Sequence, residues 1–272
     1  MPRNSCVDAL VLNIRISGEN NRSVCLLTPE EGIVYATLYG GPKSRLRSLV
    51  SQWNCGRMYL YRDASKKSCK ITDFDVKKYH VTYRENLFKS WAASLAAEIV
   101  IKTQCAGSFR ECWFLLNGFL DGLELTDENA GRLGLIRFLW RYLGLLGVRP
   151  DAGNCVLCGT SFFTGISEKN RVLYKNVVSA FSITENGFLC SDCRSNDLLS
   201  GDAGPDSGSD ILPVGVDAVG YLWAISNFEP KTVRGISVSA SSYNEIKQLV
   251  FTLIENAVGT KLISIQSGMG IL

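Results

Sequence analysis

The chain has 272 residues, which is enough for two modest domains or one large one. Hydrophobic residues make up 46% of it and charged residues 20%, a balance that is ordinary for a globular protein. No segment reaches the ~18 consecutive apolar residues that a membrane helix needs, and the N-terminus MPRNSCVDAL lacks the apolar core of a signal peptide. We therefore expect a soluble protein of a reducing compartment, most simply the cytoplasm, with no membrane partner.

The formal net charge of +3 is unevenly divided along the chain. Residues 1–80 carry 13 Lys and Arg against 7 Asp and Glu, a balance of +6. Residues 81–272 carry 16 against 19, a balance of −3. A basic N-terminal third predicts a binding surface for a polyanion.

Strand-like segments fill the first 80 residues. Alternating and β-branched stretches occur at 10–16, 23–28, 32–39, 58–62 and 70–76. Turn-forming residues separate them at 18–21, 29–32 and 40–42. Five short strands predict a small closed barrel, for which the OB-fold is the commonest arrangement and an SH3-like barrel the alternative. We expect this barrel to span residues 1–80 and to bind nucleic acid.

Basic residues cluster within the predicted barrel. The candidates for nucleic-acid binding are Lys43, Arg45, Arg47, Arg57, Arg62, Lys66, Lys67 and Lys70. Aromatic residues are interleaved with them, namely Tyr35, Tyr39, Trp53, Tyr59 and Tyr61. Cations neutralise phosphates and release counterions, while aromatic rings stack on unpaired bases. A solvated basic loop beside core aromatics is the alternative interpretation.

Helical periodicity dominates residues 81–272. A capping box at Thr82 and Glu85 predicts a helix through residue 99, and further helices are predicted at 109–120 and from Thr126/Asp127 to 146. Two more are predicted at 214–226 and 243–258, the last with a capping box at Ser242 and Glu245. Residues 198–213 have the composition of an acidic loop. The expected fold class is therefore α+β: an OB-fold barrel, then an α-helical domain at 81–272 with a Cys₄ zinc module inserted at 150–195.

Two Cys-x-x-Cys pairs define that module, Cys155/Cys158 and Cys190/Cys193. Each pair offers two thiolates from one tight bend, and two such bends form a closed tetrahedral shell for Zn²⁺. Four thiolates leave no open coordination position, so we expect the metal to be structural. Paired disulfides, a redox dithiol or an iron–sulfur cluster are the alternatives. The other six cysteines are scattered without regular spacing, as is typical of buried thiols in a reducing compartment.

Motifs for catalysis are not found in the sequence. The chain has one histidine, His80, which we interpret as a surface or packing residue. Gly41-Pro42-Lys43-Ser44 only superficially resembles a phosphate-binding loop, because Pro42 lacks the N–H that such a cradle requires. We interpret the protein as a binder rather than an enzyme.

Four strings resemble the RecO family of bacterial recombinational-repair proteins. The most specific is FLWRYLGLLGVRP at 138–150 followed by CVLCG at 155–159, a Leu-rich helix that ends before a C-x-x-C-G knuckle. The others are LTPEEG at 27–32, GGPKSR at 40–45 and NGFLCSDC at 186–193. The last has Asn186 where the family's knuckle usually has Gly. The resemblance covers nearly the whole chain.

This resemblance implies a DNA repair recombination mediator with an OB-fold, a helical domain and a zinc site. Such proteins bind single- and double-stranded DNA, anneal complementary strands and, with RecR, help to load RecA onto strands coated by single-stranded DNA-binding protein. For the C-terminal tail of that coating protein we expect a hydrophobic pocket rimmed by basic residues in the helical domain, with Arg132, Arg137 and Arg141 as candidates. An exposed polar helix face is the alternative for these arginines. A zinc-containing OB-fold RNA-binding factor and a protein scaffold are the rival functions.

Overall fold

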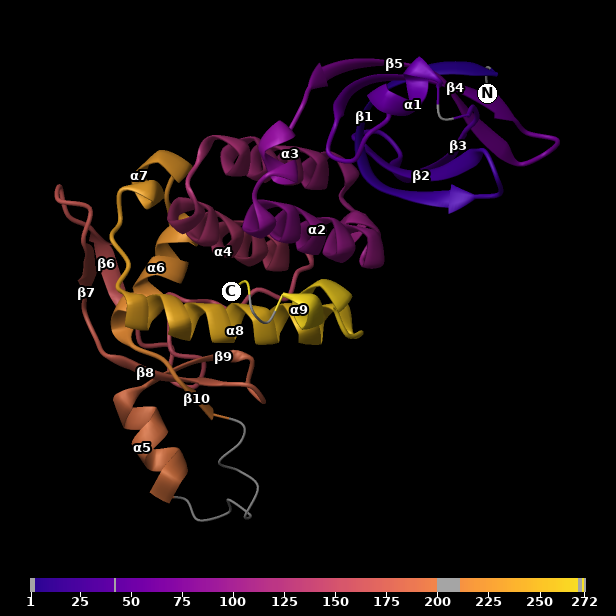
Figure 1. Ribbon diagram of the computed structural model, residues 1–272. Coiled ribbons are helices and arrows are strands. Elements are labelled where there is room, and N and C mark those ends of the chain that lie inside the picture. The colour runs from indigo at the N-terminus through magenta and orange to yellow at the C-terminus, as the bar shows by residue number, and fades with distance from the viewer. Residues whose placement is uncertain (1–2, 42, 200–210, 269–270, 272) are drawn as a thin grey trace. The chain divides into compact units, whose positions relative to one another are not determined.

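The computed structural model describes residues 3–41, 43–199, 211–268 and 271, and has the expected α+β class (Figure 1). The chain forms two compact units. The first contains Met1–Phe138 together with Val258–Leu272, and the second contains Leu139–Ala257. The predicted domain boundary at residue 80 falls inside the first unit, between its barrel and its helices, and stays a prediction.

A closed barrel of five strands forms the N-terminal part of the first unit. Its strands are β1 (Asn4–Ser17), β2 (Asn21–Thr28), β3 (Gly32–Leu38), β4 (Cys55–Asp63) and β5 (Ser68–Lys78). Their order is β1-β2-β3-β5-β4, and β4 pairs back onto β1. β3 and β5 run parallel, and the short helix α1 (Arg45–Leu49) connects β3 to β4. This order is OB-like, so the expectation of an OB-type barrel is confirmed.

Alternating residues of these strands fill the barrel. Val24 and Leu26 of β2 and Ala36 and Leu38 of β3 point into one core with Met58 and Leu60 of β4, Ile71 and Phe74 of β5, and Ala9 and Val11 of β1. The intervening residues therefore face outward, because successive side chains of a strand point to opposite sides.

Helices complete the first unit. They are η1 (Val81–Arg84), α2 (Leu87–Lys102), η2 (Gln104–Gly107), α3 (Phe109–Leu125), the first part of α4 (Glu128–Leu145) and α9 (Ile263–Ser267). The predicted capping box at Thr82 is wrong. Thr82 instead donates its N–H and hydroxyl to the Glu124 carboxylate, and α2 begins five residues later, where the Asn86 side chain accepts from the Lys89 N–H. The predicted cap of α4 is confirmed at Asp127, which accepts from the Ala130 N–H.

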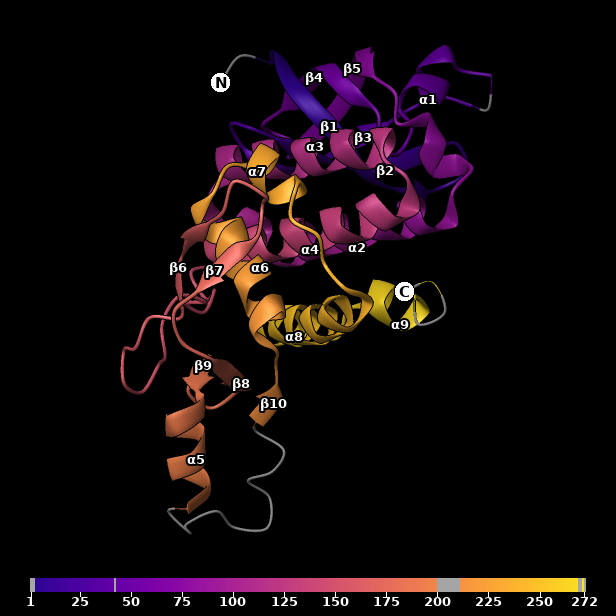
Figure 2. The ribbon, with the colours of Figure 1, turned by 90° about the vertical axis from the view of Figure 1, so that its left-hand side faces the viewer.

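Short strands surround the cysteines in the second unit. β8 (Val178–Ser182) lies between β9 (Gly187–Cys190) and β10 (Ile211–Pro213), and Figure 2 shows α5 (Ser191–Leu199) continuing from β9. β6 (Phe163–Ile166) and β7 (Val172–Tyr174) form a separate hairpin. Of the predicted acidic loop, 198–199 belong to α5 and 211–213 form β10, while 200–210 lie outside the described residues.

Three helices follow in this unit: α6 (Val216–Asn227), α7 (Pro230–Arg234) and α8 (Ala240–Val258), whose last residue belongs to the first unit. The predicted capping box at Ser242 is wrong. Ser239 accepts from the Ser242 N–H, so α8 begins one turn earlier, and Glu245 accepts from the Gly215 N–H. Among the described residues, no helix combines the length and apolar character needed to cross a membrane.

Candidate metal centre and nucleic-acid interface

The first cysteine knuckle is a tight backbone turn. The Gly159 N–H donates to the Cys155 carbonyl, and the Cys155 N–H donates to the Thr160 carbonyl, each at 2.9 Å. Gly159 has φ +71°, a left-handed conformation that glycine adopts without steric cost. The turn places Cys155 in a buried position and leaves Cys158 exposed.

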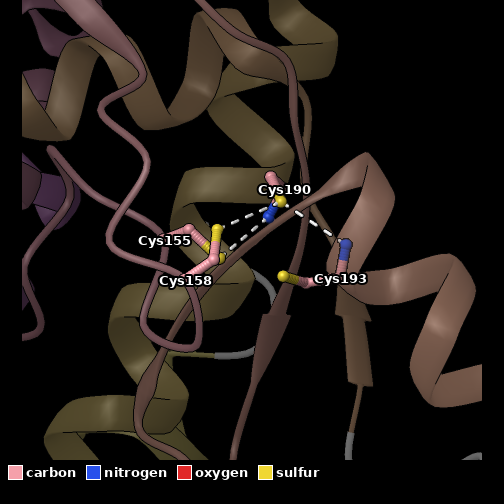
Figure 3. A group of neighbouring side chains, drawn as sticks. All are labelled: Cys155, Cys158, Cys190 and Cys193. Carbon is pink, nitrogen blue, oxygen red and sulfur yellow. Dashed lines mark hydrogen bonds between the residues drawn. The ribbon is translucent and has the colours of Figure 1, made fainter.

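The second knuckle joins a strand to a helix. Cys190 is the last residue of β9 and Cys193 lies in the first turn of α5. The Cys193 N–H donates to Cys190 Sγ at 3.4 Å, and the Cys190 N–H donates to Cys155 Sγ at the same distance (Figure 3). Backbone N–H groups aimed at sulfur stabilise negative charge there, as a thiolate ligand requires.

Packing between the knuckles brings the four sulfurs together. The Val156 N–H donates to the Phe188 carbonyl at 2.9 Å. A Cβ atom at Gly187 would lie 2.5 Å from Val156 Cβ, so only glycine permits this approach. Asn186 before it has φ +47°, the left-handed conformation that a glycine would also supply. The departure from the family's Gly-Gly therefore leaves the turn intact.

The sulfur geometry fits a metal ion. All four Sγ atoms lie within 4.8 Å of one another, and the Cys158 and Cys190 sulfurs are 3.7 Å apart. A tetrahedral zinc site with Zn–S bonds near 2.3 Å has sulfur–sulfur edges of about 3.8 Å. A disulfide needs about 2.05 Å, and all ten cysteines are free in this structure. The predicted ligands Cys155, Cys158, Cys190 and Cys193 thus converge on one point that can hold a metal.

The pKa values of Cys158, Cys190 and Cys193 are shifted in different directions. Hydrogen bonds with the Thr160 side chain and backbone lower the pKa of Cys158 to about 6. A hydrogen bond with Cys158 raises the pKa of Cys193, and burial raises that of Cys190. Several thiolates in one small site repel one another, and a bound cation removes that repulsion.

Three of the predicted DNA-binding cations lie on the connection between β3 and β4. Lys43 and Arg45 are exposed and Arg47 is half-buried. Arg45 and Arg47 belong to α1. This segment is the most strongly basic connection of the described barrel, because no acidic residue occurs between Gly32 and Asp63.

Three further cations lie on the hairpin of β4 and β5. Lys66 and Lys67 are exposed at its turn, where the Asp63 carboxylate accepts from the Lys66 N–H. Lys70 lies on the outer face of β5, with its ammonium group 5.1 Å from the centre of the Tyr39 ring. Lys70 is also paired in register with Thr37 of β3.

The remaining two cations are compensated by carboxylates. Arg62 forms two 2.7 Å hydrogen bonds with Glu31. Arg57 is paired in register with Asp8 on one neighbouring strand and with Asp75 on the other. Their predicted role in DNA binding stays a prediction, but the surrounding charge weakens their attraction for phosphate.

Arg15 is a further exposed cation of the barrel, and the sequence reasoning left it out because it considered only the basic run between residues 43 and 70. It is exposed on β1, directly opposite Ser23 of β2. The available signal was the alternation in LVLNIRI, which gives Arg15 the opposite side to Ile14, a residue packed against the barrel core.

The three arginines proposed for a partner tail lie on α4. Arg132 is bound to Glu128 and to the Ile271 carbonyl, and its guanidinium lies 4.9 Å from the Phe88 ring centre. Arg137 and Arg141 are one helical turn apart and share a face, whereas nine residues separate Arg132 from Arg141, about 180° around a helix. This assignment stays a prediction.

His80 is buried between the barrel and its helices. Its Nδ1 lies 2.7 Å from the Trp53 carbonyl, its Nε2 lies 3.2 Å from Asp121, and its ring stacks on Tyr83. These contacts give His80 the packing role that was one of the two expectations for it.

Comparison with known proteins identifies the family. The family model described as the C-terminal region of recombination protein O matches residues 84–264, which include α2 to α8 and all four cysteines. The chain belongs to the RecO family. The DNA repair protein RecO of Desulforamulus reducens is 22% identical over 258 residues, covering 94% of this chain and 90% of that protein. RecO of Bacillus subtilis is 22% identical over 259 residues with the same coverage, and RecO of Moorella thermoacetica is 28% identical over 196 residues, covering 71% and 68%.

Proposed function

We propose that this RecO-family protein is a DNA repair recombination mediator. It binds single- and double-stranded DNA, anneals complementary strands and, with RecR, helps to load RecA onto strands coated by single-stranded DNA-binding protein. The observation that carries the proposal is an OB-type barrel with a basic connection, on which Lys43 and Arg45 are exposed and Arg47 is half-buried, in a chain of this family. OB-folds commonly bind oligonucleotides.

DNA binding that does not depend on base sequence is what annealing requires. The guanidinium groups of Arg45 and Arg47 and the ammonium group of Lys43 bind backbone phosphates, which are the same in every strand. Two unpaired strands repel each other through these phosphates, and a cationic surface screens the repulsion while bases search for their register. No covalent step and no nucleotide hydrolysis is needed.

Zinc has a structural role in this proposal. Cys155, Cys158, Cys190 and Cys193 hold Zn²⁺ with four thiolates, which joins two backbone turns separated by 31 residues of sequence. The ion supplies folding free energy rather than chemistry, because four protein ligands leave no coordination position for a substrate.

Partner binding is assigned to the helices. We retain Arg132, Arg137 and Arg141 as candidates for contacts with the acidic tail of the DNA-coating protein. RecA is reached indirectly, through DNA and RecR. The protein acts in the bacterial cytoplasm, at the nucleoid when it is bound to DNA.

Annealing of two labelled complementary oligonucleotides, without ATP and across a salt series, tests the proposal. We expect wild-type protein to accelerate annealing, with an effect that fades as salt rises. We expect the double variant Arg45→Gln/Arg47→Gln to anneal more slowly. The slope of log Kobs against the logarithm of the salt concentration, measured for single-strand binding, should become less negative by about 0.7 for each lost phosphate contact. The matched double variant Arg57→Gln/Arg62→Gln removes the same charge from positions that are compensated by carboxylates. Its annealing rate and the salt dependence of its binding should change less.

Each rival function predicts a different result. Tight RNA binding without annealing would indicate an RNA-binding factor. If folded, zinc-loaded protein shows no salt-dependent binding of nucleic acid, a scaffold function is indicated. A double Arg45/Arg47 variant that keeps wild-type salt dependence would contradict the assignment of the basic connection.

A further inference from the structure

One of the four cysteines that can hold zinc is open to solvent. Cys155 and Cys190 are 2% and 6% exposed and Cys193 is half-buried, whereas Cys158 is exposed. The space beside Cys158 is open as well, because a Cβ at Gly159 would meet no atom within 4 Å. A dissolved oxidant therefore reaches the Cys158 sulfur more easily than the other three.

A second sulfur lies close behind the exposed one. Cys158 Sγ and Cys190 Sγ are 3.7 Å apart, and Figure 3 marks the contact between them. A disulfide has an S–S bond of about 2.05 Å, so the two sulfurs must approach by about 1.7 Å to form one. The Cys193 N–H donates to Cys190 Sγ at 3.4 Å, which stabilises negative charge on that sulfur. Cys190 is thus shielded from solvent but placed to react with a modified Cys158.

These two sulfurs belong to different knuckles. Cys158 ends the first Cys-x-x-Cys pair, Cys190 begins the second, and 31 residues separate them. The Val156 N–H donates to the Phe188 carbonyl at 2.9 Å, which holds the two turns side by side through the backbone. A bond between Cys158 and Cys190 joins the same turns that a metal joins. A disulfide within either Cys-x-x-Cys pair closes only a short loop and leaves the knuckles unconnected.

We propose that Cys158 is a site of reversible oxidation by peroxide and that Cys190 converts the oxidised form into a disulfide. The proposal rests on the proposed structural role of zinc and goes beyond it. The Cys158 thiolate attacks hydrogen peroxide, so a sulfur–oxygen bond forms, the oxygen–oxygen bond breaks and hydroxide leaves. The Cys190 thiolate then attacks the Cys158 sulfur, so a sulfur–sulfur bond forms and the oxygen leaves as a second hydroxide. Two thiolates are oxidised to one disulfide, and one peroxide is reduced to two hydroxide ions.

The disulfide replaces the metal as the link between the knuckles. Oxidation removes two of the four thiolate ligands, so zinc is released. Cys155 and Cys193 are left as free thiols, while the bond between Cys158 and Cys190 keeps the two turns together. A dithiol reductant restores the thiolates, and added zinc then binds again. The module therefore loses its metal in peroxide without losing its cross-link.

Zinc-loaded wild-type protein treated with graded hydrogen peroxide tests this chemistry. Zinc release is followed with a colorimetric chelator, and disulfides are mapped by mass spectrometry of peptides after free thiols are alkylated. We expect zinc release and the Cys158–Cys190 disulfide to appear together in equal molar amounts. Dithiothreitol followed by added zinc should reverse both. The amides of β8 and β9 should exchange more slowly in the oxidised protein than in reduced protein from which zinc has been chelated.

Two histidine substitutions form a matched pair. Cys158→His and Cys193→His each leave a Cys₃His ligand set, which is a common structural zinc site. We expect Cys158→His to release zinc about tenfold more slowly in peroxide, because it lacks the accessible thiolate on which oxidation begins. Cys193→His keeps both reacting cysteines and should release zinc at the wild-type rate. Cys6→Ser, which removes an exposed cysteine of the barrel, should also release zinc as wild type does.

The disulfides mapped in wild-type protein decide the outcome even where a variant fails to fold. Zinc release with disulfides only inside the Cys155/Cys158 or Cys190/Cys193 pair would overturn the proposal. Equal release rates in Cys158→His and Cys193→His would show that oxidation does not begin at Cys158. Protein that keeps its zinc in excess peroxide would exclude the oxidation site. Folded wild-type protein that binds no zinc at all would instead contradict the proposed structural role of the metal.

Discussion

At the scale of single residues, Gly187 decides how closely the two cysteine knuckles approach. Its position against Val156 leaves no space for a side chain. The strand residue after it, Phe188, accepts the hydrogen bond from Val156 that joins the knuckles. A change at Gly187 therefore acts on the metal centre without removing a ligand.

We expect Gly187→Ala to destabilise the module by about 1–3 kcal/mol, the usual cost of overpacking. The added methyl group must push Val156 away and so separate the cysteine pairs. Zinc content and the thermal unfolding midpoint are the measurements. Gly165→Ala is the control, because a Cβ there meets no atom within 4 Å. Unchanged zinc content and midpoint in Gly187→Ala would show that the knuckles tolerate a wider separation.

Sequence reasoning predicted the grouping of the four cysteines and was incomplete for the arginines. Cysteine spacing is local information, so the convergence of these four side chains could be predicted from two short motifs. The pairing of Arg62 with Glu31 joins residues that are distant in sequence and depends on closure of the barrel. No local pattern distinguishes Arg62 from Arg45, whose surroundings are exposed.

At the scale of elements, the C-terminal segment is attached to α2 by one carboxylate. Glu98 accepts from the N–H groups of Ile263 and Ser264 at 2.9 and 2.8 Å, at the start of α9. The Trp91 indole also donates to the Ser264 carbonyl at 2.6 Å. Burial raises the pKa of Glu98, but hydrogen bonds from Ser264, Ile263 and Lys102 outweigh it and hold the pKa below 4.5.

We expect Glu98→Gln to release this segment in a pH-dependent manner. A carboxylate whose pKa is lowered by folding contributes its full stability above its unfolded pKa of 4.5 and loses it as pH falls through the folded pKa. Hydrogen bonds to a charged group contribute about 1.5–3 kcal/mol, so exchange of the Ile263 and Ser264 amides should accelerate about tenfold or more at pH 7. The difference from wild type should shrink as pH falls below 4.5.

Glu128→Gln serves as the control for this experiment, because Glu128 is paired with Arg132 on an exposed helix surface and should have little effect. An equal difference between Glu98→Gln and wild type at every pH would contradict a role for the charge.

Helix ends show where local sequence rules reached their limit. Thr82 and Glu85 have the spacing of a capping box, but Thr82 binds Glu124, a residue of another element. Asn86 is an equally good cap by residue type and is the one used. The sequence predicted the described helices of twelve or more residues, which are α2, α3, α4, α6 and α8. The choice between neighbouring capping residues depended on tertiary contacts.

At the scale of the whole molecule, the metal centre and the barrel belong to different compact units. The cysteines lie in Leu139–Ala257 and the strands of the barrel in Met1–Phe138. Each unit has its own buried residues, so loss of the metal should be felt mainly in the unit that contains it.

We expect chelation of zinc under reducing conditions to increase hydrogen exchange in residues 151–195 while the amides of β1–β5 keep their protection. Single-strand DNA binding should persist in the metal-free protein at low temperature. Cys158→Ser should reproduce the effect, and Cys6→Ser, at an exposed cysteine of β1, should not. Loss of barrel protection on chelation would show that the two units unfold together.

The order of the strands in the barrel could not be predicted from the sequence. Five segments and their turns were visible as alternation and punctuation, and they fit an OB-fold and an SH3-like barrel alike. The deciding feature is the parallel contact of Thr37 with Lys70, which brings β5 between β3 and β4. Contacts between strands distant in sequence leave no periodic signature in either strand.

The return of the chain to its first unit has a consequence for biosynthesis. Residues 258–272 belong with 1–138, and the second unit is inserted between them. During translation the inserted unit therefore leaves the ribosome whole, while the first must wait for its closing segment. Until Ile263 and Ser264 reach Glu98, the surface of α2 that they cover stays open to chaperones and to other nascent chains.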